Sequence, residues 1–119
     1  MFNYMVEYLS PLDAVFHALS DPTRRAMLKH LSAGEQKVGD LAAPFDMSLA
    51  AASKHVKVLE AAGLLRREVR GRAHVCRLDV GPMHAGLEWM RYYEKFWNAQ
   101  LDTLEEILNS EDSEKEKKS

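Results

Sequence analysis

The first part of the chain combines apolar residues at helical spacing with signals for helix starts. Apolar side chains recur every three or four positions within residues 11–19, which predicts a first helix. Asp21 followed by Pro22 is typical of a second helix start, because the aspartate can cap free amides and the proline has no amide that needs a partner. This helix is expected to end near Ala33, and a short third helix is expected over residues 38–43.

A fourth helix with one bare face is expected after this third one. Ser48 is a suitable N-cap, and Gly63 suits the left-handed position just after a helix end. Ala52, Val56 and Leu59 fall on one face, which we assign to the core. The opposite face therefore carries small, hydrogen-bonding and cationic side chains.

A β-hairpin is expected next. Residues 64–69 and 74–78 have the pattern of strands, and the RGR sequence between them contains the glycine of a tight reversal, with Arg70 and Arg72 at the tip. This order of elements predicts a mostly α fold with a small β-hairpin, a winged helix-turn-helix. In that arrangement the capped helix enters the major groove of DNA, and the hairpin reaches the adjacent backbone or minor groove.

One long helix with a wide apolar surface is expected from Pro82 onward. Its apolar residues form two neighbouring stripes, too wide a surface for one contact within a small domain. One stripe can dock on the body, while the other pairs with the same helix of a second subunit, with help from the first helix and residues 1–9. The alternative is that all these aromatic residues are internal core. The expected residues of the dimer interface are Leu12, Phe16, Trp97, Leu101, Leu104 and Leu108. Residues 110–119 are charged and low in complexity, which predicts a disordered tail after a single domain of residues 1–109.

The net charge of −2 hides a strong asymmetry. Residues 48–77 contain seven Lys or Arg against two Glu, whereas the rest of the chain is acidic. Such asymmetry favours a surface for a polyanion, although an ordinary solvated face gives the same count.

Composition excludes several other classes of protein. The single cysteine, Cys76, rules out an intrachain disulfide framework, and we interpret it as a small buried hydrophobe rather than a redox sensor. No segment resembles a signal peptide or a membrane span, so we expect a soluble, cytoplasmic protein without a membrane partner. No phosphate-binding loop, dinucleotide fingerprint or nucleophile elbow is present, so we expect no enzyme activity and no cofactor.

Three segments resemble the ArsR/SmtB-type bacterial transcriptional regulators: LSDPTRRAMLKHL, VGDLAAPFDMSLAAASKHVKVLEAAGLL and REVRGRAHVCRLD. The resemblance covers roughly residues 12–108 and is most specific in residues 53–64. It implies a homodimer that binds double-stranded DNA at an operator with imperfect twofold symmetry. It also implies a repressor that is released by an effector, which the sequence does not identify.

The metal-sensing positions of that family are altered in this sequence. Lys37 stands where one site has its first thiol. The second site's positions are Asp79, Gly81, Tyr92 and Lys95, of which only the aspartate could bind a metal. Asp13 with His17, and His84 with Glu88, share helix faces but provide only two ligands each. We therefore expect no regulatory metal.

Together these patterns predict a homodimeric DNA-binding transcriptional regulator, and a repressor rather than an activator. The expected DNA-contacting residues are Ser48, Ala50, Ser53, Lys54, His55, Lys57, Arg70 and Arg72. Within this set, Ser48 meets a phosphate near the helix N-terminus, and Lys57 with the two hairpin arginines meets phosphates or the minor groove. The alternative is a winged-helix module for protein contacts without DNA binding.

Overall fold

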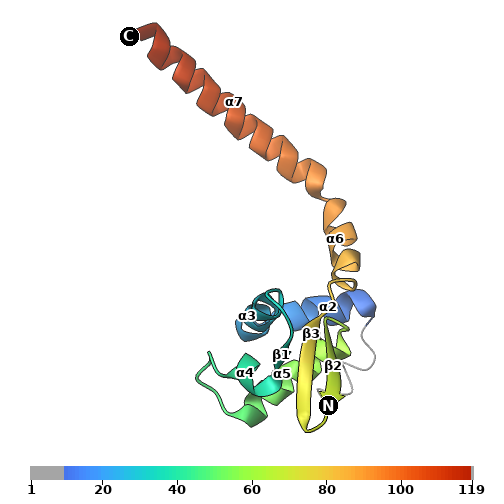
Figure 1. Ribbon diagram of the computed structural model, residues 1–119. Helices are drawn as coiled ribbons and strands as arrows, with labels where there is room; N and C mark the ends of the chain where they lie inside the picture. The colour runs from blue at the N-terminus through green and yellow to red at the C-terminus, as the bar shows by residue number, and fades with distance from the viewer. Residues whose placement is uncertain (1–9, 119) are drawn as a thin grey trace. The chain divides into compact units, whose positions relative to one another are not determined.

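The computed structural model describes residues 10–118, with only the backbone for residues 113–118. Residues 1–9, which the sequence assigned to subunit pairing, lie outside the described residues. The chain forms two compact units, Met1–Gly86 and Leu87–Ser119. Figure 1 shows the elements in chain order, and their bounds are α2 (Pro11–Leu19), α3 (Pro22–Leu31), β1 (Gln36–Lys37), α4 (Val38–Ala42), α5 (Leu49–Ala61), β2 (Leu65–Arg70), β3 (Ala73–Leu78), α6 (Met83–Arg91) and α7 (Glu94–Lys118).

The helix starts read from the sequence are confirmed in atomic detail. The Asp21 carboxylate accepts a hydrogen bond from the Arg24 amide at 3.0 Å, and Pro22 occupies the first turn of α3. The Ser48 hydroxyl accepts the Ala51 amide at 3.1 Å and thereby caps α5. These caps satisfy amides that have no partner within their own helix, so each helix begins where its cap stands.

Gly63 ends α5 in the left-handed conformation, with φ of 75°. Its amide donates to the Glu60 carbonyl at 3.0 Å, and the next amide, that of Leu64, donates back to the Leu59 carbonyl at 3.0 Å. This pair of bonds is a Schellman motif, and both leucines are fully buried beneath it. The turn therefore ends α5 and directs the chain into β2.

The hairpin of β2 and β3 is the predicted one, with a third strand added. The sheet order is β1–β3–β2, all antiparallel, and Arg70 pairs with Ala73 across a two-residue turn. Gly71 adopts a φ of 63° in this turn, which suits a glycine at the first central position of a hairpin. β1 was not predicted, because its two residues are too few to show an alternation of apolar and polar positions.

A single hydrophobic core holds the helices of the first unit against the sheet. The fully buried side chains with the largest volumes are Val15, Met27, Leu41, Val56, Leu59, Leu64, Leu65 and Cys76. Cys76 is a free thiol with no exposed surface, as predicted, and burial raises its pKa. The core therefore anchors α5 through one face and leaves the opposite face outside.

The predicted long C-terminal helix is present as α7, but the helical region expected from Pro82 onward is divided into two helices. α6 ends at Arg91 and α7 begins at Glu94. At the break the Tyr93 amide bonds to the Met90 carbonyl three residues earlier, and the rings of Tyr92 and Tyr93 meet edge to face with centroids 4.9 Å apart. Neighbouring side chains on a regular helix do not face each other, so this contact accompanies a local departure from the helix.

The backbone of α7 is helical through Lys118, and the disordered tail after residue 109 stays a prediction. The helix thus crosses the boundary predicted at residues 109 and 110 without a break. None of the described helices is long and apolar enough to cross a bilayer.

We expect Gly63→Ala to destabilise the first unit by about 1–2 kcal/mol, because an L-residue is strained at this backbone angle. The added Cβ would also lie 3.1 Å from the Pro82 ring. Gly39→Ala is the matched control, since no atom lies within 4 Å of its Cβ position and its φ is not positive. Urea unfolding should show a loss only for Gly63→Ala; equal midpoints for both variants would contradict the left-handed turn.

Candidate nucleic-acid interface

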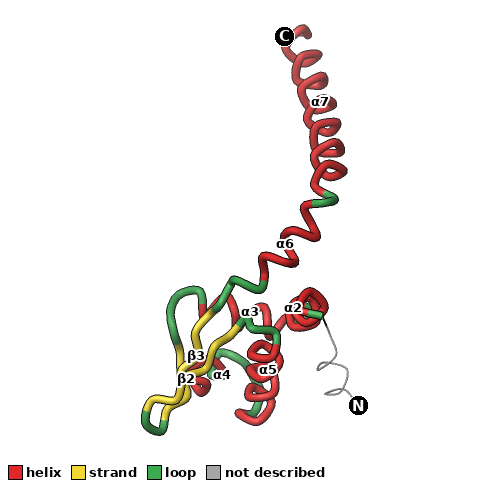
Figure 2. Tube along the Cα trace, turned by 90° about the vertical axis from the view of Figure 1, so that its right-hand side faces the viewer, coloured by secondary structure: helices red, strands yellow, loops and turns green. Residues whose placement is uncertain are grey.

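The candidate nucleic-acid interface is formed by three consecutive elements: α4, α5 and the β2–β3 hairpin. α4 and α5 are joined by a turn of six residues, 43–48, and pack against each other through the core. The hairpin extends beyond the helices, so its turn lies at the end of a projection (Figure 2). A helix pair followed by a projecting hairpin is the arrangement expected from the sequence.

The outer face of α5 is open and cationic. Ala50, Lys54 and Lys57 are exposed and Ser53 is partly exposed, whereas the core face is buried. Among the described residues, neither lysine has an ion-pair partner within 4 Å. Their charges are therefore available to an external anion.

The two arginines at the hairpin tip differ in their surroundings. Arg72 is exposed, and no ion pair joins it to another described residue. Arg70 instead donates to the Glu35 carboxylate at 2.8 and 3.3 Å and to Glu68 at 3.0 Å. These hydrogen bonds raise the pKa of Arg70, and the arginine lowers the pKa of Glu35. Only Arg72 is ready for an outside partner without exchanging an internal one.

The positive charge of residues 48–77 is partly neutralised by acidic groups that are distant in the sequence. Arg66 pairs with Asp79 at 2.9 Å. Arg67 of β2 makes a two-pronged contact with Glu60 of α5, at 2.9 and 3.1 Å. Counting charges along the chain missed Asp79 and Glu35, because both lie outside the counted segment.

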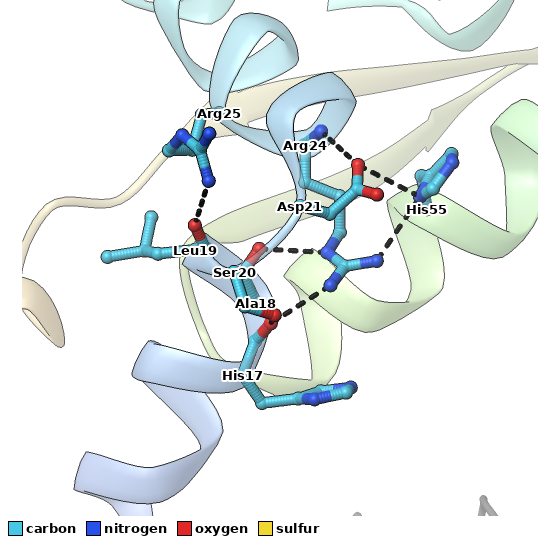
Figure 3. A network of polar contacts seen from close by, with 8 residues as sticks. All are labelled: His17, Ala18, Leu19, Ser20, Asp21, Arg24, Arg25 and His55. Carbon is cyan, nitrogen blue, oxygen red and sulfur yellow. Dashed lines mark hydrogen bonds and ion pairs between the residues drawn. The ribbon is translucent and has the colours of Figure 1, made fainter.

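His55 does not lie with the open lysines. Its Nδ1 is 3.3 Å from Nη1 of Arg24 and 3.9 Å from a carboxylate oxygen of Asp21, in a network that joins α5 to the start of α3 (Figure 3). On a helix with 3.6 residues per turn, His55 is rotated about 100° from Lys54. The structure thus separates His55 from the other predicted contact residues of α5.

A shallow hollow of about 330 Å³ lies where α4, α5 and the hairpin meet. It is lined by Lys37, Val38, Gly39, Leu49, Ser53, Arg67 and His74. Lys37 and Leu49 are both exposed at its edge. The sequence singled out Lys37 only as a replaced metal ligand, so its place beside the outer face of α5 was missed.

The family's metal positions carry other contacts here. Asp79 accepts hydrogen bonds from Arg66 at 2.9 Å and from the Gly81 amide at 3.0 Å. In the part of the chain that the structure describes, no three His, Cys, Asp or Glu side chains are grouped closely enough to hold a metal ion. Regulation without a metal stays a prediction.

The capped helix with its open basic face, followed by the projecting hairpin, defines a winged helix-turn-helix, a class of DNA-binding proteins. Residues 19–68 match the family described as a helix-turn-helix domain. The chain is 36% identical over 108 residues to the HTH-type transcriptional regulator Rv2034 of Mycobacterium tuberculosis, covering 90% of this chain and 96% of that protein. It is 32% identical over 79 residues to the transcriptional repressor SdpR of Bacillus subtilis, covering 66% of this chain and 88% of that protein.

Solved structures agree with these relatives. The ArsR family transcriptional regulator RHA00566 superimposes with a TM-score of 0.69 at 39% identity, over 75% of this chain and 98% of that chain. The homodimeric winged helix-turn-helix domain of Mb0332 from Mycobacterium bovis gives a TM-score of 0.57 at 26% identity, over 70% of this chain and 80% of that chain. The chain belongs to the ArsR family of winged helix-turn-helix transcriptional regulators, as the sequence predicted.

The contact between Glu60 and Arg67 should make stability depend on pH. The hydrogen bond from Arg67 lowers the pKa of Glu60, so the added stability is present above the ordinary glutamate pKa of about 4.3 and is lost as the pH falls through the lower, folded value. Because Glu60 is 39% exposed, we expect less than about 1 kcal/mol. Urea midpoints of Glu60→Gln should fall below wild type at pH 7 and converge with it near pH 3. Glu105→Gln, on exposed α7, is the control that should follow wild type throughout.

Proposed function

We propose that this regulator is a homodimeric repressor that binds an imperfectly palindromic operator in double-stranded DNA. The observation that carries this proposal is that Lys54 and Lys57, on the open face of a capped helix, have no ion-pair partner among the described residues, with Arg72 on the neighbouring hairpin. The similarity to a transcriptional repressor supports repression as the mode of action.

The groove contacts follow from the shape of α5. Ala50 allows the backbone to approach DNA closely, and Ser53 and Lys54 reach base edges in the major groove. Ser48 contacts a phosphate, aided by the free amides and the dipole of the helix N-terminus. Lys57, further along α5, contacts a phosphate through its own charge. These contacts are assigned to the side chains on the face of α5 that is not buried in the core, and to its N-cap.

The hairpin supplies the second contact. Arg72 inserts into the minor groove or meets a phosphate beside it. Arg70 reaches a phosphate only after it exchanges a carboxylate of Glu35 or Glu68 for the DNA oxygen, because both carboxylates hold it in the free protein. The two arginines therefore contribute unequally to affinity.

Dimerisation sets the spacing of the two recognition helices. One helix contacts only a few base pairs, and two copies must lie about 34–36 Å apart to reach successive turns of DNA. The stripe of Trp97, Leu101, Leu104 and Leu108 is between 48 and 61% exposed in the single chain, which supports pairing with a second copy. Leu12 and Phe16 of α2 complete the proposed interface, and the homodimeric Mb0332 domain supports the assembly.

No metal takes part in the proposed function. Lys37 and Gly81 supply no ligand at two of the family's metal positions, and Tyr92, between α6 and α7, and Lys95 of α7 occupy the remaining pair. A lysine ammonium repels a cation, so the control of DNA binding is assigned to something other than zinc-type metals.

The experiment that tests the function is a titration of operator and random duplex DNA across a range of salt. Affinity should fall steeply with salt, because bound cations are released from DNA. Arg72→Ala should weaken both duplexes by similar factors and lower the salt slope by about one per subunit, whereas Lys54→Ala should also reduce discrimination by about 1–3 kcal/mol.

Lys29→Ala is the matched control, since it removes an exposed lysine from α3 and leaves α5 unchanged. Equal effects of Lys29→Ala and Lys54→Ala would mean that only net charge matters. If the wild-type protein binds no duplex even at low salt, the proposed DNA binding is wrong, and the alternative of a winged-helix module for protein contacts takes its place.

The dimer is tested by Leu101→Glu combined with Leu104→Glu. A charge placed in an apolar contact is left desolvated and unpaired, so the variant should sediment as a folded monomer with weak, nonspecific DNA binding. Ala99→Glu combined with Thr103→Glu adds the same charge on the opposite face of α7 and should remain a dimer. A leucine variant that still sediments as a dimer would show that the dimer interface lies elsewhere.

A further inference from the structure

Arg24 is a buried cation at the corner between α2 and α3. It is only 9% exposed, and its guanidinium is used for internal contacts. Nε donates to the Ala18 carbonyl at 2.8 Å, and Nη2 donates to the His17 carbonyl at 2.9 Å (Figure 3). Both carbonyls belong to the last turn of α2, and the His17 carbonyl also accepts from the amide and the hydroxyl of Ser20. Arg24 therefore ties the start of α3 to the end of α2.

The remaining arm of Arg24 reaches the recognition helix. Its Nη1 lies 3.3 Å from Nδ1 of His55. Arginine has only donors, so Nδ1 is the acceptor, and a neutral imidazole then carries its proton on Nε2. The Asp21 carboxylate lies 3.9 Å from the same nitrogen, which is too long for a hydrogen bond. Asp21 instead accepts the Arg24 amide at 3.0 Å.

The direction of the His55 ring agrees with an internal role. Its side chain is 24% exposed, and the ring edge carrying Nδ1 faces Arg24 and Asp21 (Figure 3). His55 is rotated about 60° from the buried Ala52 and about 100° from the open Lys54. The imidazole thus stands at the border of the core face, toward the corner of α2 and α3.

We propose that His55 is a positioning residue: by accepting the Arg24 hydrogen bond on Nδ1, it fixes the rotation of α5 against the corner of α2 and α3, so that Ser53 and Lys54 face DNA. The proposal rests on the proposed function and removes His55 from the groove contacts. An interface that is ordered before binding loses less entropy on binding, so this lock raises affinity for the operator. It also satisfies a buried guanidinium donor that is costly to leave unpaired.

The test compares two substitutions of His55, each of which places a polar group near only one of the two imidazole nitrogens. In His55→Asn the side-chain oxygen can stand near the position of Nδ1 and accept from Arg24. In His55→Gln the longer amide reaches the position of Nε2 and leaves Nδ1 without a substitute. Both variants and wild type are titrated with operator and random duplex across a range of salt, after their melting temperatures confirm folding.

We expect His55→Asn to keep the operator affinity within about threefold and His55→Gln to lose about tenfold or more, the usual size for a lost charged hydrogen bond. The salt slope should be the same for all three proteins, because no phosphate contact is removed. The reverse order, with Gln active and Asn impaired, would show that Nε2 works directly on DNA and would overturn the proposal. A salt slope lowered in both variants would also overturn it.

Measurements on the free protein separate this proposal from the proposed function. At pH 8 the imidazole nitrogen shifts should show the proton on Nε2 of His55, and amide hydrogen exchange of α5 should be faster in His55→Gln than in His55→Asn. A proton on Nδ1, or equal exchange in both variants, would overturn the positioning role. Absence of DNA binding by wild type would overturn the proposed function alone.

Discussion

The burial of one face of α5 is the constraint on which the rest of the structure depends. Ala52, Val56 and Leu59 have no exposed surface, so the core decides which face of the helix turns inward, and the proposed contact between His55 and Arg24 holds the helix in that rotation. Since side chains on a helix are separated by about 100° per residue, that rotation places Lys54 and Lys57 outside. The Schellman turn at Gly63 then directs the chain into the hairpin, so one packed face also determines where the wing begins.

Acidic partners decide which positive charges remain available. Of the arginines on the hairpin strands, Arg66, Arg67 and Arg70 are each held by a carboxylate, and two of these carboxylates come from other parts of the chain. Exposed pairs of this kind contribute little stability. Their larger effect is on the surface, because the basic side chains of residues 48–77 that no carboxylate among the described residues holds are Lys54 and Lys57 of α5, Arg72 at the turn of the wing and Arg77 of β3.

The corner of α2 and α3 links α2, which is part of the proposed dimer interface, to α5, the proposed DNA-recognition helix. Arg24 holds two carbonyls of α2 and one nitrogen of His55, so three helices share a single guanidinium. A buried charge of this kind is costly unless every donor is satisfied. This cost favours one rotation of α5, because in another rotation Nη1 of Arg24 would lose its hydrogen bond to His55.

The sequence by itself determined the helices with strong caps, the left-handed Gly63, the hairpin and the family. These features depend on local chemistry: a carboxylate or hydroxyl near free amides, a glycine without Cβ, and apolar spacing. Only the tertiary structure decided that Arg70 is held by Glu35, that His55 turns toward Arg24, and that the C-terminal helix breaks at Tyr92. The first two depend on residues more than thirty positions apart in the chain, which spacing along the sequence does not bring together. The break is accompanied by an edge-to-face contact between the neighbouring Tyr92 and Tyr93 rings, which a helical pattern of apolar residues does not reveal.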